Sequence, residues 1–519
     1  MKNQTKCISL LCLPAFIGAL PMLWQQFQIA LNTNHAWLLI VAERLLQGGR
    51  YVSDFYEPNP PMSLIIYIPQ YWLHTLLGIP LQFTPALFGL IYILMAAGCL
   101  LYLLKKTNVF TDNRLSSILF IAFLLAGIFM PGNIYFSERD HYVFLTLVPV
   151  LLAQIAITNG HRFHPAYARA GFFFGGLLLL IKPHYGLFPA IVFVHRLYKN
   201  KAIMPVFRSP DFQGLAASVI CYALILLTIF PEYPDKIFQD FLTIYLGDLS
   251  KNIFPYFFYY ASFCLFVVAG AYFLPIPKDH HEAINALVLA SLIAFFLYYL
   301  QGKNFTYHTI AGLSFLYMAL VVLTWSLIQT FVFRNKQACT AACVTLVIAL
   351  TGAYTIRPPL QDFPTHSEYM TTPLSKEIEQ CESPCPHFIF SENMEIIFQI
   401  AVYSGEQHAS RYPGLWWLDY AVKHAEDEAL RQKHLHYMAE DFERYAPKRL
   451  IIATNMTRGG IKNFDLMAYM KQNVELEKIL SRYDYDHTLK DNRRYYFTGT
   501  NFDTDFPILY DVYTLNRPE

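Results

Sequence analysis

Long apolar runs dominate the first two thirds of the chain. A membrane-spanning helix needs about 20 consecutive apolar residues. Runs of that kind, bounded by polar residues, cover 8–30, 83–104, 115–131, 142–158, 212–230, 254–274, 284–300, 309–330 and 338–354. This pattern predicts an α-helical polytopic membrane protein, and we read the first run as a signal anchor, with a cleaved signal peptide as the alternative.

Basic residues indicate how two further apolar stretches lie relative to the membrane, because Lys and Arg are enriched in cytoplasmic loops. If 62–79 crossed the membrane, Lys105 and Lys106 would lie outside, so we expect this stretch to lie along the outer membrane surface. The stretch 170–197 has basic loops on both sides. We therefore expect it to form two short helices that turn at Lys182-Pro183-His184, since proline breaks a helix. The result is about eleven spans, with the N-terminus inside and the C-terminus outside.

Polar residues gather in the loops that this topology puts outside. The predicted membrane domain is 1–354, with a long first outer loop over 31–82, and the predicted extracytoplasmic domain is 355–519. Of the 519 residues, 55% are hydrophobic and 15% charged, which suits a chain with lipid as its solvent. A formal net charge of +1 gives no nucleic-acid footprint.

The C-terminal domain alternates short apolar strands with amphipathic helices, which predicts a small α/β domain. The predicted strands are 387–391, 449–455 and 495–499, and the predicted helices lie near 393–404, 420–445 and 464–480. We find no Gly-rich phosphate loop, nucleophile elbow or metal-spacing motif in it, and interpret it as an accessory cap.

Two cysteines lie in the predicted extracytoplasmic domain, in the sequence QCESPCPH. In an oxidising compartment, Cys381 and Cys385 are expected to form a local disulfide. Free thiols and a weak metal site with His387 are the alternatives.

The first outer loop contains two carboxylates before a proline-rich turn. Asp54 and Glu57 are followed by Pro58, Pro60 and Pro61, which stiffen the chain. Carboxylates held near the membrane surface suit a general base or a cation site. The alternative interpretation is a pair of solvated loop carboxylates. Upstream, the apolar spacing predicts a helix over 36–46, which ends at Gly48.

Other ionisable residues lie at the predicted outer ends of the spans. The second outer loop contains Glu138, Arg139, Asp140 and His141. Such residues at a membrane boundary are costly unless they pair or serve a function. Lys182, at the turn between the two short helices, could hold a phosphate as a point charge; a snorkelling lysine is the alternative. A further outward-facing polar group comprises Lys303, Tyr307 and His308.

The order of these motifs resembles the GT-C superfamily of membrane glycosyltransferases. The chain has EPNPP at 57–61, ERDH at 138–141, a KP turn at 182–183 and PYFFYY at 255–260, followed by a C-terminal soluble domain. The similarity is greatest to the bacterial branch of aminoarabinose transferases and protein mannosyltransferases. It covers roughly residues 1–355.

The resemblance implies an inverting transfer of a sugar from a polyprenyl-phosphate carrier to a lipid, glycan or protein acceptor. The reaction would take place at the outer face of a bacterial inner membrane. Glu57 and Asp140 fall on acidic positions of the family and Lys182 on its lysine between the short helices. The implied catalytic candidates are Glu57, Asp54 and Asp140. The implied substrate-binding candidates are Asn34, His35, Glu138, Arg139, Lys182, Lys303 and His308, of which Arg139, Lys182 and Lys303 are the phosphate candidates. Some family members use a divalent metal and others do not, so metal dependence is left open and no cofactor is assigned.

One position departs from the family pattern. Asn34 stands where the family usually carries its first-loop catalytic Asp, and His35 follows where a second acid is common. An asparagine cannot accept a proton as a base. Another acid, or His35, would have to replace it; otherwise the chain is an inactive scaffold that binds a lipid-linked sugar. A lipid or glycan transporter is the remaining alternative, although the chain shows no inverted repeat.

Overall fold

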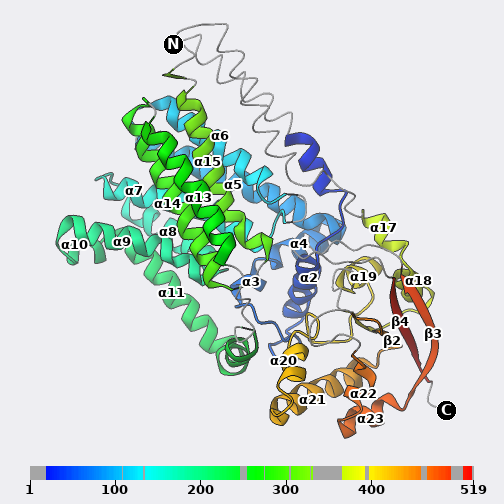
Figure 1. Ribbon diagram of the computed structural model, residues 1–519. Coiled ribbons are helices and arrows are strands. Elements are labelled where there is room, and N and C mark those ends of the chain that lie inside the picture. The colour runs from blue at the N-terminus through cyan, green and yellow to red at the C-terminus, as the bar shows by residue number, and fades with distance from the viewer. Residues whose placement is uncertain are drawn as a thin grey trace. The chain divides into compact units, whose positions relative to one another are not determined.

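The computed structural model (Figure 1) describes most of the chain. The described residues are 19–107, 109–110, 112–132, 135–245, 254–273, 275–302, 305–327, 329–330, 365–391, 397–456, 464–491 and 507–516. Contacts divide the chain into two compact units. Unit 1 comprises Met1–Phe27, Pro85–Ile225 and Ser250–Asp362, and unit 2 comprises Gln28–Thr84, Leu226–Leu249 and Phe363–Glu519.

Unit 1 is built from helices. They are α5 (Thr84–Thr107), α6 (Asn113–Phe129), α7 (Arg139–Thr158), α8 (Pro165–Leu179), α9 (Leu187–Asn200), α10 (Met204–Phe207), α11 (Pro210–Thr228), α13 (Phe254–Phe273), α14 (Lys278–Leu300) and α15 (Ile310–Leu327). Among the described residues, five helical segments are long and apolar enough to cross a membrane. They are Leu81–Thr107, Arg139–Thr158, Pro210–Thr228, Lys278–Leu300 and Thr306–Leu327.

The chain is thus a polytopic helical membrane protein with a small sheet region, as its hydrophobic pattern predicts. Two shorter apolar helical segments, Asn113–Phe129 and Phe257–Phe273, coincide with further predicted spans. The predicted span at 338–354 and residues 8–18 of the one at 8–30 fall outside the described residues. The number of about eleven spans therefore stays a prediction.

Close approach between helices depends on small side chains. On α15, a Cβ at Gly312 would lie 2.6 Å from the Phe295 ring of α14, so only glycine leaves room for that ring. The Phe295 ring also stacks on Tyr260 of α13, with ring centroids 4.3 Å apart. One buried aromatic ring therefore contacts both α13 and α15.

The predicted pair of short helices forms where the sequence places it. α8 and α9 have 15 and 14 residues, which correspond to about 22 and 21 Å, less than the roughly 30 Å of a hydrocarbon core. Between them lies the 3₁₀ helix η2 (Pro183–Gly186). Near its C-terminal end, α9 is tied to α11 by a buried ion pair with 2.6 Å between Arg196 Nη2 and Asp211 Oδ2.

In unit 2, the first outer loop forms three helices. α2 (Thr33–Leu46) begins at the cap Asn32 and is followed by Gly48, whose φ of 86° explains why the helix ends there. The apolar stretch 62–79 forms two short helices, α3 (Met62–Ile65) and α4 (Ile68–Leu77). The 10 residues of α4 span about 15 Å, too little to cross a bilayer. Exposed apolar side chains on α4, Trp72 at 48% and Leu76 at 76%, suit the predicted place at the membrane surface.

The C-terminal part of unit 2 contains a four-stranded sheet in the order β1-β2-β4-β3. β1 (His387–Phe390) and β2 (Arg449–Ala453) are parallel, as expected for two buried apolar strands. β3 (Tyr483–Asp491) and β4 (Ile508–Leu515) are antiparallel and were not predicted. The predicted strand 495–499 falls outside the described residues.

Two predicted helices of this domain are each divided, which corrects the sequence prediction. The helix near 420–445 is two helices, α20 (Leu418–Lys423) and α21 (Glu428–Tyr445). The one near 464–480 is α22 (Leu466–Met470) and α23 (Val474–Leu480). In both cases a polar cap starts the second helix: Asp427 accepts from Leu430 N, and Asn473 accepts from Glu475 N. The remaining helices are α17 (His366–Met370), α18 (Pro373–Gln380) and α19 (Ile397–Ser404).

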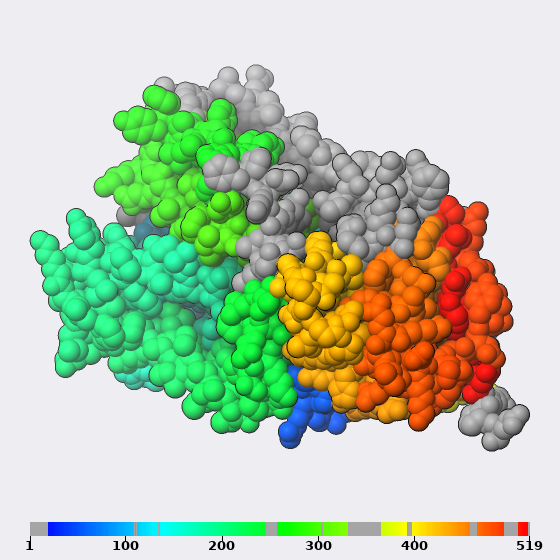
Figure 2. All heavy atoms as spheres, turned by 60° about the horizontal axis from the view of Figure 1, so that its bottom comes forward, coloured from blue at the N-terminus to red at the C-terminus, as the bar shows by residue number. Residues whose placement is uncertain are grey.

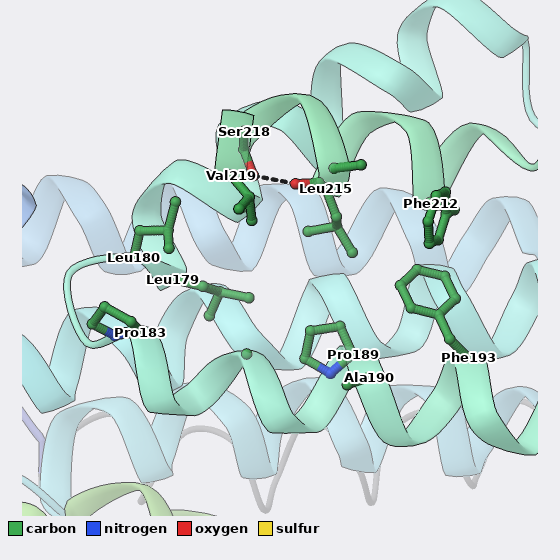
Figure 3. Close-up of a pocket in the computed structure, with 13 residues that line it drawn as sticks. Leu179, Leu180, Pro183, Pro189, Ala190, Phe193, Phe212, Leu215, Ser218 and Val219 are labelled. Atoms are coloured by element: carbon green, nitrogen blue, oxygen red, sulfur yellow. Dashed lines mark hydrogen bonds between the residues drawn. The ribbon is translucent and has the colours of Figure 1, made fainter. Parts of the chain in front are cut away.

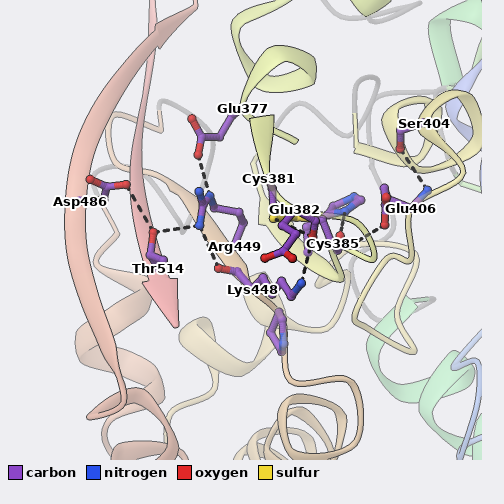
Figure 4. Close-up of a disulfide and its surroundings, with 12 residues drawn as sticks. Glu377, Cys381, Glu382, Cys385, Ser404, Glu406, Lys448, Arg449, Asp486 and Thr514 are labelled. Atoms are coloured by element: carbon purple, nitrogen blue, oxygen red, sulfur yellow. Dashed lines mark hydrogen bonds and ion pairs between the residues drawn. A yellow bond between two sulfur atoms is a disulfide. The ribbon is translucent and has the colours of Figure 1, made fainter. Parts of the chain in front are cut away.

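A disulfide joins Cys381 to Cys385 immediately before β1 (Figure 4). Glu406 lies outside the loop that the disulfide closes, and its carboxylate accepts from Cys385 N at 2.5 Å. Beside it, Arg449 of β2 pairs with Glu377 of α18 at 2.7 Å. The disulfide therefore lies among polar contacts that join α18 to the sheet.

Two buried arginines hold the first outer loop against the C-terminal segment within unit 2. Arg44 of α2 donates to the carbonyl oxygens of His408 and Ser410, each at 2.8 Å. In return, Arg411 donates to Val52 O at 2.8 Å and pairs with Asp441 of α21 at 2.8 Å. The side of the membrane on which each segment lies stays a prediction.

The segment after α11, which the topology predicts to be a third outer loop over 231–253, belongs to the same unit. One of its contacts is made by Asp240, in the short helix α12 (Phe238–Asp240). Lys433 of α21 donates to both of its oxygens, at 2.9 and 2.7 Å, and Tyr56 also donates to it. Burial alone would raise the pKa of Asp240, but the hydrogen bonds from His434, Lys433 and Tyr56 lower it to about 2. In Figure 2 the green atoms of this loop border the yellow-to-orange atoms of the C-terminal segment.

These contacts show that the three predicted outer segments form one compact unit. Contacts do not report insertion into lipid, so the division into a membrane domain over 1–354 and an extracytoplasmic domain over 355–519 stays a prediction.

Replacing Arg411 by Met should strongly destabilise unit 2. The substitution leaves the Asp441 carboxylate, whose side chain is 1% exposed, without its cationic partner. Breaking a buried pair from one side costs about 3–5 kcal/mol. The measurement is thermal unfolding of the full chain, with limited proteolysis of unit 2 as the readout. Arg431→Met is the control, because its partner Glu428 has a side chain that is 55% exposed, and such pairs contribute at most about 1 kcal/mol. Equal melting of both variants would contradict the prediction.

Unit 2 should also lose stability as the pH falls. Burial lowers the pKa of His387 to about 4 and that of His408 well below its ordinary value. Both stay neutral in the folded protein but take up a proton near pH 6.5 when unfolded. Their contribution is therefore complete above about pH 6.5 and is lost as the pH falls towards the folded pKa values. Melting curves at pH 7.5 and 4.5 test this.

His387→Asn should flatten that pH dependence. His424→Gln should leave it unchanged, because the His424 side chain is 46% exposed. A wild-type melting temperature that does not change between the two pH values would contradict the prediction.

Candidate functional site

The candidate site of unit 1 forms where three segments end or begin. α7 begins at Arg139 with Glu138 as its cap. η2 supplies the turn between α8 and α9, and the 3₁₀ helix η6 (Thr306–Thr309) precedes α15. All three are segments whose polar residues the topology predicts to lie outside.

At its centre, the structure brings together Asp140, Lys182 and His308. Lys182 Nζ lies 2.5 Å from Asp140 Oδ2 and 2.8 Å from His308 Nδ1. All three are buried, with exposed fractions of 0%, 6% and 6%. The ammonium is the donor in both contacts, so His308 Nδ1 accepts and Nε2 would carry the proton. The 3.5 Å approach of His308 Nδ1 to Asp140 Oδ2 is then a contact between two acceptors around one cation.

Two tyrosines surround this cluster. The Tyr185 hydroxyl donates to Asp140 Oδ1 at 3.2 Å, which leaves Oδ2 for Lys182. Lys182 Nζ also lies 5.1 Å from the centre of the Tyr307 ring, within cation–π range. Lys182 and Tyr185 reach the same carboxylate because residues i and i+3 of a 3₁₀ turn lie on one face.

The other ionisable residues of the second outer loop lie at the start of α7 beside Asp140. Glu138 and Arg139 are buried and approach each other, with 3.8 Å between Arg139 Nε and Glu138 Oε2. His141 accepts from Ser137 N at 3.1 Å. Ser137 has a φ of 66°, which aims its amide back at the helix that follows. The loop is thus tightly folded at the start of α7.

A buried ammonium has lost its water and needs negative or lone-pair partners. Here Asp140, His308 and the Tyr307 ring take the place of water. An anion with several oxygens could compete for the same ammonium, because Lys binds phosphate as a point charge without fixed geometry. The arrangement can therefore hold a phosphate or support a neighbouring carboxylate.

In unit 2, the carboxylates of the first outer loop serve different contacts. Glu57 is 2% exposed and accepts from Trp37 Nε1 at 2.6 Å and from Asn59 N at 2.9 Å, and the Asn59 side chain also donates to it. Asp54 accepts from Arg50 N at 2.9 Å and pairs with Arg444 of α21 at 2.7 Å. Although burial would raise the pKa of Asp54, the hydrogen bonds from Arg50 N, Ser53 and Arg444 lower it. Both carboxylates fix the shape of their own loop.

Asn34 and His35 lie in the first turn of α2. The cap Asn32 accepts from His35 N at 2.8 Å, and the His35 ring lies 5.8 Å from that of Tyr67. His35 is buried and Asn34 half-buried. Lys303 lies outside the described residues. Within the described part of the chain, no group of three or more His, Cys, Asp and Glu side chains could hold a metal ion.

Sequence reasoning missed Tyr185 and Asp240. Tyr185 stands three residues after Lys182 in KPHYG, a spacing that would have indicated it if the turn had been expected to be 3₁₀. Asp240 gave no such signal, because its partners Lys433 and Tyr56 are distant in sequence.

No protein-family model matches the chain, and no curated protein matches it in sequence. A search of solved structures found similarity to the crystal structure of ArnT from Cupriavidus metallidurans in the apo state. The match covers 97% of this chain and 98% of that one, with 11% sequence identity and a TM-score of 0.43. ArnT is an aminoarabinose transferase of the GT-C family.

Proposed function

We propose that the protein is a membrane glycosyltransferase that moves a sugar from a polyprenyl-phosphate donor to an envelope acceptor. The observation that carries the proposal is the buried trio Asp140, Lys182 and His308. An ionisable cluster in the membrane region of a protein is costly, and its default explanation is function. Together with the motif order of the outer loops, it favours chemistry on a lipid-linked anion.

Lys182 would bind the phosphate of the donor. As the bond to the sugar breaks, negative charge develops on the departing phosphate, and a preorganised cation in a dry site stabilises that charge. The contact to His308 is the more easily given up, because it joins a cation to a neutral ring. Arg139 and Lys303 remain candidates for further phosphate contacts.

Asp140 is the carboxylate best placed to be the base. When Lys182 turns towards a phosphate, Asp140 Oδ2 loses its ammonium partner and is available to accept a proton. It would then take the proton from the acceptor hydroxyl. The acceptor oxygen attacks the anomeric carbon opposite the phosphate, and the carbon–oxygen bond to the phosphate breaks. The polyprenyl phosphate leaves with the bonding electrons, and the configuration inverts.

Asp54 and Glu57 are also candidates from the sequence. Their contacts are with their own loop and with Arg444, which favours positioning of the first outer loop over proton transfer. A direct comparison of variants of the three carboxylates therefore identifies the one that acts as the base.

Asp140→Asn should lower transfer by about 10²–10⁴-fold, the range expected for loss of a general base. Lys182→Ala should lower it comparably, whereas Asp54→Asn and Glu57→Gln should have smaller effects. The measurement is transfer of radiolabelled sugar from polyprenyl-phosphate donors to envelope acceptors in proteoliposomes. Lys199→Ala is the matched control, because this exposed lysine lies in the last turn of α9. Full activity of Asp140→Asn would exclude it as the base.

The alternative is a scaffold that binds the lipid-linked sugar without turnover, and Asn34 favours it. In that case the wild type would bind the donor but transfer nothing from any donor tested. Lys182→Ala would then abolish donor binding while Asp140→Asn would not lower it. Retained binding without transfer in the wild type, together with transfer in Asn34→Asp, would assign the difference to this one position.

A further inference from the structure

An apolar pocket lies in unit 1 between α8, α9 and α11 (Figure 3). Its volume is about 210 Å³. The lining residues are Gly176, Leu179, Leu180, Pro183, Gly186, Pro189, Ala190, Phe193, Phe212, Leu215, Ala216, Ser218 and Val219. From Gly186, the cap of α9, the lining extends along that helix to Phe193, about 10 Å along the helix axis.

The surface of the pocket is almost entirely apolar. Ser218 carries the one side-chain hydroxyl among these residues, and it donates to Leu215 O of its own helix at 2.7 Å. An apolar cavity of about 150 Å³ stays dry and accepts apolar molecules instead. The pocket is therefore suited to hydrocarbon.

The pocket opens on the outside of the helices. Pro183, Ala190 and Val219 are exposed, Val219 to 56%. Next to the mouth, Leu187 and Ile220 are also exposed, to 37% and 61%. Since α11 is one of the helices long and apolar enough to cross a membrane, we expect this exposed apolar surface to face lipid.

The turn between α8 and α9 has one face on the pocket and another on the ionic cluster. Leu180, Pro183 and Gly186 line the pocket at intervals of three residues. Lys182 and Tyr185, also three apart, contact Asp140. A group that packs into the pocket would therefore press on the back of the turn that presents Lys182.

We propose that this pocket binds an acyl chain of a bilayer phospholipid, and that the bound chain holds the turn from behind. A phospholipid is favoured over the polyprenyl donor because the pocket has no charged group for a head group. Lys182 is not among the lining residues and is paired with Asp140. Binding then depends on the chain alone, and phospholipids are the most concentrated source of chains in a bilayer. The binding does not rest on the proposed transferase activity.

Photo-crosslinking in nanodiscs tests the occupant. The full chain is placed in phosphatidylcholine nanodiscs that contain a fraction of phosphatidylcholine with a diazirine in its acyl chain. After illumination, we expect labelling of the pocket segments of α8, α9 and α11. Ala190→Phe and Ala216→Phe should fill the pocket and lose this labelling. Ala217→Phe should keep it, because Ala217 is exposed but does not line the pocket.

Hydrogen exchange of the amides at 180–186 tests the effect on the turn. Transfer of the wild type from detergent to nanodiscs should slow exchange there, and Ala190→Phe should already show slow exchange in detergent. The proposal would be overturned if the filled variants and the control were labelled equally, or if no labelling occurred. It would also be overturned if a diazirine-bearing polyprenyl phosphate displaced the phospholipid from the pocket. Unchanged exchange in the turn would overturn the second half of it. A melting temperature like that of the wild type shows that a variant is folded.

Discussion

A charged side chain that leaves water must find a partner, and this requirement decides which segments of the chain meet. Lys182 and Asp140 join the turn before α9 to the start of α7. Arg196 and Asp211 join α9 to α11, and Arg411 and Asp441 join two parts of the C-terminal segment. In each pair, loss of one partner would leave a buried charge that costs several kcal/mol. Hydrophobic packing alone would tolerate many arrangements of these helices, whereas the ion pairs specify one.

Much of the fold could be predicted because hydrophobic runs and basic loops are local signals. The two short helices around Lys182 follow from basic residues on both sides of one apolar stretch, and the end of α2 follows from Gly48. The strands β3 and β4 escaped prediction for a physical reason. β3 reads YDYDHTLKD, with polar side chains through most of its length. Its own sequence therefore gives no strand signal, and it is recognised only by its pairing with β4.

The candidate site shows the same limit. The sequence indicates Asp140, Lys182 and His308 one by one, since each is ionisable and lies near the end of an apolar run. It does not indicate that one ammonium lies between a carboxylate and an imidazole, because that depends on helix packing. Likewise, the proline-rich turn suggests two available carboxylates, but Glu57 is buried against Trp37 and Asp54 pairs with Arg444.

The hydrogen bonds from Arg44 to His408 O and Ser410 O have a consequence for the order in which the chain folds during synthesis. Its acceptor at His408 comes 364 residues later in the sequence. At about 5–20 residues per second, a ribosome needs roughly 20–70 s to synthesise that interval. During this time the first outer loop exists without the segment that completes it, and its arginine has to remain hydrated. The loop can reach its final form only after synthesis has passed Ser410.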